Sequence, residues 1–71
     1  MATFTIVEKW FDDSENKTET FYLNHSCLNS LSFGSEEMAW TTEDRTEAEM
    51  MYEACVTKHP DNDIEMLELH Y

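Results

Sequence analysis

Positive charge is scarce in this sequence. Four Lys and Arg residues stand against sixteen Asp and Glu residues, which gives a formal net charge of -12 over 71 residues. A field of that sign repels the phosphates of nucleic acids and the anionic cytoplasmic face of a membrane. Direct binding to DNA, RNA or lipid is therefore disfavoured, and the partners that this charge favours carry basic surfaces.

Glycine, proline and long apolar runs are also scarce. Gly34 is the single glycine, and one glycine cannot form a loop that cradles phosphate groups. No apolar stretch approaches the roughly eighteen residues that span a bilayer, and no charged start followed by an apolar run indicates a signal peptide. The two cysteines, Cys27 and Cys55, then predict reduced thiols in a cytoplasmic protein, although a disulfide between them stays open.

A chain of this length predicts one domain, residues 1–71, with a small core. It has little room for the large apolar cleft that a small-molecule active site needs. No Gly-x-Ser-x-Gly motif or comparable nucleophile signature occurs. We therefore expect a protein that is not an enzyme and that has no catalytic residue and no cofactor.

Alternating apolar residues predict a β-hairpin at the start of the chain. Residues 3–11 form the first strand, with Phe4, Ile6 and Trp10 on one face, and residues 18–24 form the second. A polar loop of about five residues joins them. We expect Trp10 and Trp40 to lie in the core.

The second half of the sequence predicts one helix and one or two further strands. Residues 36–40 could form a short third strand, and residues 64–71 the last strand, with a register break near Met66 and Leu67. Thr41 and Thr42 precede acidic residues, which is typical of a helix start, and the helix should run to about Lys58 before Pro60 stops it. Its apolar stripe is formed by Ala48, Met51, Tyr52, Cys55 and Val56.

These elements predict an α+β fold in which an antiparallel β-sheet of three or four strands carries one α-helix on one face. The expected order is strand, strand, a short third strand, helix, strand. This arrangement buries every apolar stripe.

Acidic residues gather before and along the predicted helix. Carboxylates about 5 to 6 Å apart along a helix approximate the spacing of phosphates along a nucleic-acid strand, so a row of them could enter a groove built for DNA or RNA. The predicted partner-binding residues are Glu36, Glu37, Glu43, Asp44, Glu47, Glu49 and Glu53. The alternative is a solvated face that only keeps the protein soluble.

Metal ligands are also present, in patterns that do not match known sites well. His25, Cys27, Cys55 and His59 are residue types that bind tetrahedral Zn²⁺, but a Cys in an apolar stripe is an ordinary core residue. The acidic turn at residues 61–65 lacks the spacing of a calcium loop. We therefore predict no metal site.

In its size and in the acidic run from Glu36 through Glu53, the chain resembles small phage-encoded anti-defence proteins, including anti-CRISPR proteins and DNA mimics. The resemblance implies an inhibitor that acts in the host cytoplasm. Its partner would be a host nucleic-acid-binding protein or complex, such as a CRISPR effector, whose positively charged channel it occupies.

A second class of function stays open. A small phage regulator or antitoxin-like module could bind through Trp10, Trp40, Met50 or an exposed sheet edge, with its charge serving solubility alone. A sheet edge could also mediate homodimerisation.

Overall fold

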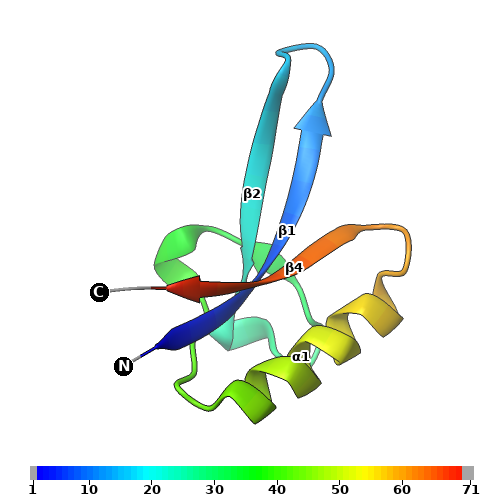
Figure 1. Cartoon of the computed structure of the whole chain (residues 1–71). Helices are drawn as coiled ribbons and strands as arrows, with labels where there is room; N and C mark the ends of the chain where they lie inside the picture. The colour runs from blue at the N-terminus through cyan, green and yellow to red at the C-terminus, as the bar shows by residue number, and fades with distance from the viewer. Residues whose placement is uncertain (1, 70–71) are drawn as a thin grey trace.

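The computed structural model describes residues 2–69 and shows a four-stranded antiparallel sheet with one α-helix (Figure 1). The sheet order is β3-β2-β1-β4, which confirms the predicted α+β class. The elements are β1 (Thr3–Asp12), β2 (Lys17–Leu23), the 3₁₀ turn η1 (His25–Cys27), β3 (Phe33–Gly34), the 3₁₀ turn η2 (Glu36–Met38), α1 (Arg45–Lys58) and β4 (Asp63–Leu69).

The central strand β1 pairs with different neighbours along its length. Residues 7–12 pair with β2 and residues 3–9 pair with β4, so only Val7, Glu8 and Lys9 have a partner strand on both sides. Beyond Lys9 the hairpin continues as two strands that project from the body of the molecule (Figure 1). We call this projecting part, residues 10–19, the ribbon.

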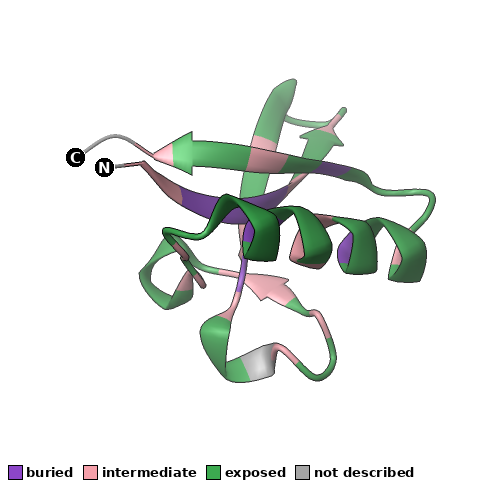
Figure 2. Cartoon of the chain, turned by 60° about the horizontal axis from the view of Figure 1, so that its bottom comes forward, coloured by how far each residue is buried: buried purple, intermediate pink, exposed green. Residues whose placement is uncertain are grey.

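The core lies between α1 and one face of the sheet. Its buried centre is formed by Ile6 of β1, Leu23 of β2, Cys55 of α1 and Ile64 of β4. Half-buried side chains that surround this centre are Leu28, Leu31, Phe33, Trp40, Met51, Tyr52 and Met66. Figure 2 shows the buried residues where β1 crosses α1 and on the inner side of the helix, while the hairpin farther out is exposed.

The predicted apolar stripe of the helix is largely confirmed. Ala48 and Cys55 are fully buried, and Met51 and Tyr52 are half-buried against the core. Val56 differs, because it is exposed at the flank of α1. The helix therefore packs by a narrow face.

The segment before α1 completes the sheet beside β1. Trp40 N–H donates to the Leu23 carbonyl at 2.7 Å, and the backbones of Phe4 and Thr42 exchange hydrogen bonds at 2.7 and 2.9 Å. Residues 40–42 thus take the place beside β1 that β2 leaves after Leu23. Trp40 packs against the core, as expected.

The expected strand at Glu36–Trp40 is wrong. Residues 36–38 form η2, with Met38 N–H bonded to the Ser35 carbonyl and Ala39 N–H to the Glu36 carbonyl. The third strand is instead β3, whose Gly34 and Phe33 pair with Tyr22 and Leu23. Because β3 already occupies the outer edge of β2 there, the alternating residues that follow turn back toward β1.

The expected cap of the helix is also wrong. The N-cap residue is Asp44, whose Oδ1 accepts from the N–H groups of Thr46 at 2.9 Å and Glu47 at 3.3 Å. Thr42 is held by its backbone pairing to Phe4, and its Oγ1 accepts from Asp44 N–H. The helix therefore begins at Arg45, and it ends at Lys58, as predicted.

The expectation that Trp10 lies in the core is wrong, because the strand that pairs with this edge of β1 ends before Trp10. Its side chain is 53 % exposed, since β4 stops at Asp63 opposite Lys9.

The loop of the hairpin has four residues, 13–16, and Asn16 adopts a left-handed φ of 53°, a conformation that Asn tolerates well.

The last strand pairs with β1 without the expected register break. The register runs regularly from Thr3 opposite Leu69 to Lys9 opposite Asp63. The final two residues of the predicted strand, 70 and 71, lie outside the described residues.

No helix among residues 2–69 has both the length and the apolar character of a membrane span.

Candidate partner-binding surface

The seven carboxylates predicted to bind a partner are all exposed. Among residues 2–69, only Glu49 of this set forms an ion pair with a cation, with Arg45 Nε at 3.3 Å. The structure does not join the seven into one row, because they fall on three separate parts of the fold.

The first part is η2, which carries Glu36 and Glu37. Tyr22 Oη donates to Glu36 Oε2 at 3.1 Å. Because successive side chains on a strand point to opposite faces, and Leu23 faces α1, Tyr22 points to the other face of the sheet. Glu36 therefore lies across the sheet from the acidic residues of the helix. Burial raises the pKa of the Tyr22 hydroxyl, and the adjacent Glu36 carboxylate raises it further.

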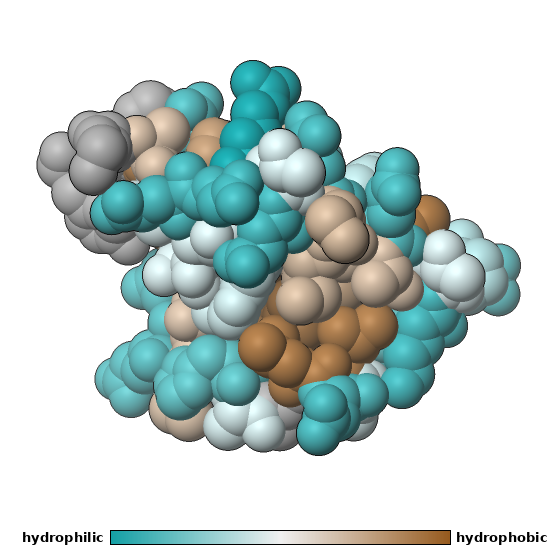
Figure 3. Space-filling model, turned by 90° about the horizontal axis from the view of Figure 1, so that it is seen from below, coloured by the Kyte–Doolittle hydropathy of each residue, from teal (hydrophilic) through white to brown (hydrophobic). Residues whose placement is uncertain are grey.

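The second part is the N-terminal turn of α1, with Glu43, Asp44 and Glu47. One oxygen of Asp44 already caps two backbone N–H groups of the helix. Asp44 and Glu47 also border a hollow of about 440 Å³ whose apolar wall is formed by Met50, Met51 and Ala54. Figure 3, which views the molecule from below, shows apolar residues gathered in the middle of this face between hydrophilic margins.

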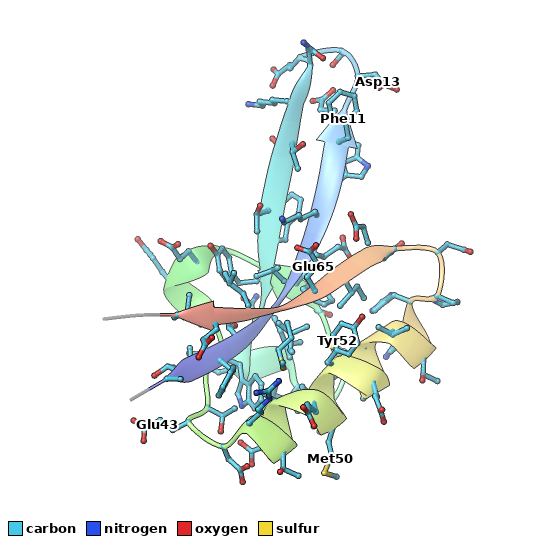
Figure 4. All side chains as sticks on the ribbon, in the orientation of Figure 1. Phe11, Asp13, Glu43, Met50, Tyr52 and Glu65 are labelled. Atoms are coloured by element: carbon cyan, nitrogen blue, oxygen red, sulfur yellow. The ribbon has the colours of Figure 1, made fainter. Side chains whose placement is uncertain are left out.

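The third part is the flank of α1 that faces β4. Glu49 and Glu53 are one helical turn apart on this flank. Glu49, Tyr52, Glu65 and Met66 line a shallow depression of about 560 Å³ between the helix and the strand. In Figure 4, Tyr52 extends from α1 toward β4, which carries Glu65.

Glu65 lines the edge of this depression, but its side chain points to the other face of the sheet, because its neighbours Ile64 and Met66 pack on the core. Its carboxylate pairs with Lys9 Nζ at 2.9 Å, and that hydrogen bond and charge raise the pKa of Lys9. The sequence could not show that Glu49 and Glu65 line one depression, because they are sixteen positions apart.

The cations neutralise little of the negative field. Lys9 and Arg45 each pair with one carboxylate, and Lys17 contacts Glu15 at 2.8 Å and Glu19 at 3.8 Å. The side chains of these pairs are largely solvent-exposed, so the pairs contribute little to stability. Most of the formal net charge of -12 is therefore left without a neutralising partner.

The histidine and cysteine residues that could bind a metal make other contacts in the structure. Cys55 is a free thiol in the core, and burial raises its pKa. The His59 ring lies edge-on to Phe33, with its Nε2 3.2 Å from the Leu31 carbonyl. The side chain of Cys27 lies outside what the structure describes. Within the described part of the chain, no three His, Cys, Asp or Glu residues form a metal-binding group.

The ribbon exposes two large aromatic residues that acidity alone does not explain. Trp10 and its neighbour Phe11 are each 53 % exposed. Figure 4 shows Phe11 and Asp13 near the far end of the ribbon, well away from Met50 on the helix. The sequence indicated Trp10 as an alternative anchor, but it did not single out Phe11.

Comparisons with protein-family models, curated proteins and solved structures give no match, so the functional argument rests on the residues and their arrangement.

Proposed function

We propose that this protein is a non-enzymatic inhibitor that binds a basic, nucleic-acid-binding surface of a host protein or complex and blocks access of DNA or RNA by charge mimicry. A CRISPR effector is one such complex, and a phage-encoded protein acting in the host cytoplasm would suit this role. The observation that supports the proposal is the exposure of all seven predicted carboxylates, of which six have no cationic partner among the described residues.

The division of these carboxylates by the sheet suggests which of them act together. Glu49 and Glu53 share one flank of α1, whereas Glu36 contacts Tyr22 on the opposite face of the sheet. A rigid partner groove can meet one of these sides at a time. We expect the α1–β4 flank to make the contact, because Glu49 and Glu53 lie one helical turn apart there, a spacing close to that of phosphates along a nucleic-acid strand.

The test is binding to a purified Cas9–guide RNA complex, which holds nucleic acid in a positively charged channel. Affinity should fall steeply between about 50 and about 300 mM salt, and target DNA should compete. Affinity that is independent of salt would contradict the proposal for this effector. The same measurements on a type I surveillance complex extend the test to a second basic channel.

Two charge-matched variants locate the contact. Glu49→Gln with Glu53→Gln removes two charges from the α1–β4 flank, and Glu36→Gln with Glu37→Gln removes two from η2. The first pair should weaken binding about tenfold or more and the second much less, because close interfacial charge pairs couple by about 1.5 kcal/mol or more. Equal effects would show that overall charge, not this flank, drives binding.

The exposure of Trp10 and Phe11 favours a second candidate, a small regulator or antitoxin-like module that binds through its aromatic residues. In that case Trp10→Ala should abolish binding at any salt concentration. Reversal of Glu49 and Glu53 to Lys should then have little effect.

A further inference from the structure

The ribbon is an aromatic surface that no other part of the described chain covers. β3 pairs with β2 only at Tyr22 and Leu23, and β4 ends opposite Lys9. Trp10 and Phe11 beyond that point therefore have neither a third strand beside them nor, within residues 2–69, a side chain that buries them. A protein with so small a core seldom leaves large aromatic residues exposed, so Trp10 and Phe11 are candidates for interface anchors.

The two faces of the ribbon differ in chemistry. Trp10 lies directly opposite Glu19, and Glu8 and Asp12 flank it at the next same-face positions of β1. An exposed indole is thus framed by three carboxylates, and Lys17, opposite Asp12, shares this face and contacts Glu19 at 3.8 Å. Phe11, on the other face, lies opposite Thr18.

A preformed hollow lies beside the free edge of β1. It has a volume of about 280 Å³ and is lined by residues 8–11 of β1 and by residues 61–63, which lead into β4. Asn62 Nδ2 donates to Glu8 Oε2 at 2.8 Å, which holds this turn against the base of the ribbon. A partner side chain would enter a site that needs little reordering.

The charge of the ribbon selects the occupant. Its acids are Asp12, Asp13, Glu15 and Glu19, and Lys17 is its single cation. Hydrogen bonds from Ser14 lower the pKa of Asp12, so this carboxyl stays ionised at neutral pH. A second copy of this chain or a nucleic acid would bring negative charge to negative charge. The occupant must be basic.

Arginine fits this surface better than lysine. A guanidinium is planar and weakly hydrated, so it stacks on an aromatic ring while its edge donates hydrogen bonds to carboxylates, whereas an ammonium is a strongly hydrated point charge. We propose that Trp10 and Phe11 on the ribbon dock the protein on an arginine-rich surface of its partner, with a guanidinium stacked on Trp10 between the flanking carboxylates. This inference rests on the proposed function, because it assumes a basic partner.

The test uses two defined probes of equal charge, nona-arginine and nona-lysine peptides, with affinities measured by calorimetry at low salt. The wild-type chain should bind nona-arginine about two- to fivefold more tightly than nona-lysine, the range that a solvent-exposed cation–π contact supports. Trp10→Leu with Phe11→Leu should remove this preference and leave the nona-lysine affinity unchanged. Met50→Ala, which alters an even more exposed apolar residue on α1, should keep the preference.

Nuclear magnetic resonance of the wild-type protein gives a reading that does not depend on how the variants fold. The chain has two indole N–H signals, from Trp10 and from Trp40, and the second packs against the core. Titration with nona-arginine should shift the Trp10 signal and leave that of Trp40 nearly unchanged.

The outcomes separate the inference from the proposed function. Equal affinity for the two peptides, with an unshifted Trp10 signal, would overturn the role of the ribbon while leaving charge-driven binding intact. Tighter binding of nona-lysine would overturn it as well. If neither peptide binds at low salt, the proposed function fails, and the inference fails with it.

Discussion

The Thr5 hydroxyl donates a hydrogen bond of 2.6 Å to the carbonyl of Trp40, which joins β1 to a segment 35 positions later in the chain. Thr5 is fully buried, although most threonines are exposed. Together with the backbone bonds between Phe4 and Thr42, this contact fixes the segment that leads into α1.

Thr5→Val should therefore destabilise the protein by about 1–2 kcal/mol, because it keeps the shape of the side chain and removes the donor from a partly buried carbonyl. Chemical denaturation measures the change. Thr20→Val, at an exposed position of β2 where no hydroxyl contact is made, is the matched control and should change stability little. Equal losses in the two variants would show that the Thr5 bond contributes nothing.

Asp44→Ala should destabilise the protein by about 1 kcal/mol, because it removes the cap of two helix N–H groups. Glu43→Ala removes the same charge from the preceding residue, which makes no cap, and should cost much less. Thermal unfolding of the two variants compares them directly. If Asp44 also contacts a partner, the affinity of the Asp44→Ala variant should be interpreted only after its loss of stability has been measured.

Gly34→Ala should destabilise β3, because a Cβ atom at this position would lie 2.5 Å from Asn24 Nδ2. Side-chain crowding of this kind typically costs about 1–3 kcal/mol. In a background of Asn24→Ala the same substitution should cost clearly less, since the crowded amide is gone. A double-mutant cycle measures this coupling, and strict additivity of the two changes would contradict the expectation.

Hydrophobic periodicity was sufficient to predict β1, β2 and β4 and the helix α1 that packs on their sheet, because a strand or helix with one apolar face must bury it. Periodicity could not show that Trp10 is exposed: alternation assigns a residue to a face, but it does not say where the neighbouring strand ends. Residues 36–40 alternate as a strand does, yet their backbone bonds locally in η2 because β3 had already taken the edge of β2.

The candidate surface was predictable in its residue types but not in its arrangement. The run from Glu36 to Glu53 is continuous in sequence, but the sheet lies between Glu36 and Glu49. Conversely, Glu65 lines the same depression as Glu49 only because β4 returns beside α1. Such pairings depend on topology, which local charge patterns do not encode.

The Cys55 thiol should react at least about tenfold more slowly with Ellman's reagent in the folded protein than in denaturant, measured in a Cys27→Ser variant so that one thiol is present. Cys55 is fully buried, and burial raises its pKa, so little thiolate forms near pH 8. The stability that the protonated thiol contributes is complete below the pKa of an unfolded cysteine and is lost as pH rises through the folded pKa. Fast labelling of the native protein would contradict this burial.

Salt should raise the melting temperature, because the net charge of -12 repels itself in the folded state and added ions screen it. The melting temperature should increase steadily from low to moderate NaCl, and KCl should act alike. A variant with Glu36→Gln and Glu37→Gln should show a smaller increase. A melting temperature that falls with salt would mean that the ion pairs outweigh the repulsion.

The pairing of Thr3 with Leu69 places the two ends of the described chain side by side, at the end of β1 opposite the ribbon (Figure 1). A fluorescent protein or affinity tag joined to either terminus would emerge on that side and leave Trp10 and Phe11 accessible. Joining the neighbouring termini by a short linker and opening the chain elsewhere would yield circular permutants that keep the same aromatic tip.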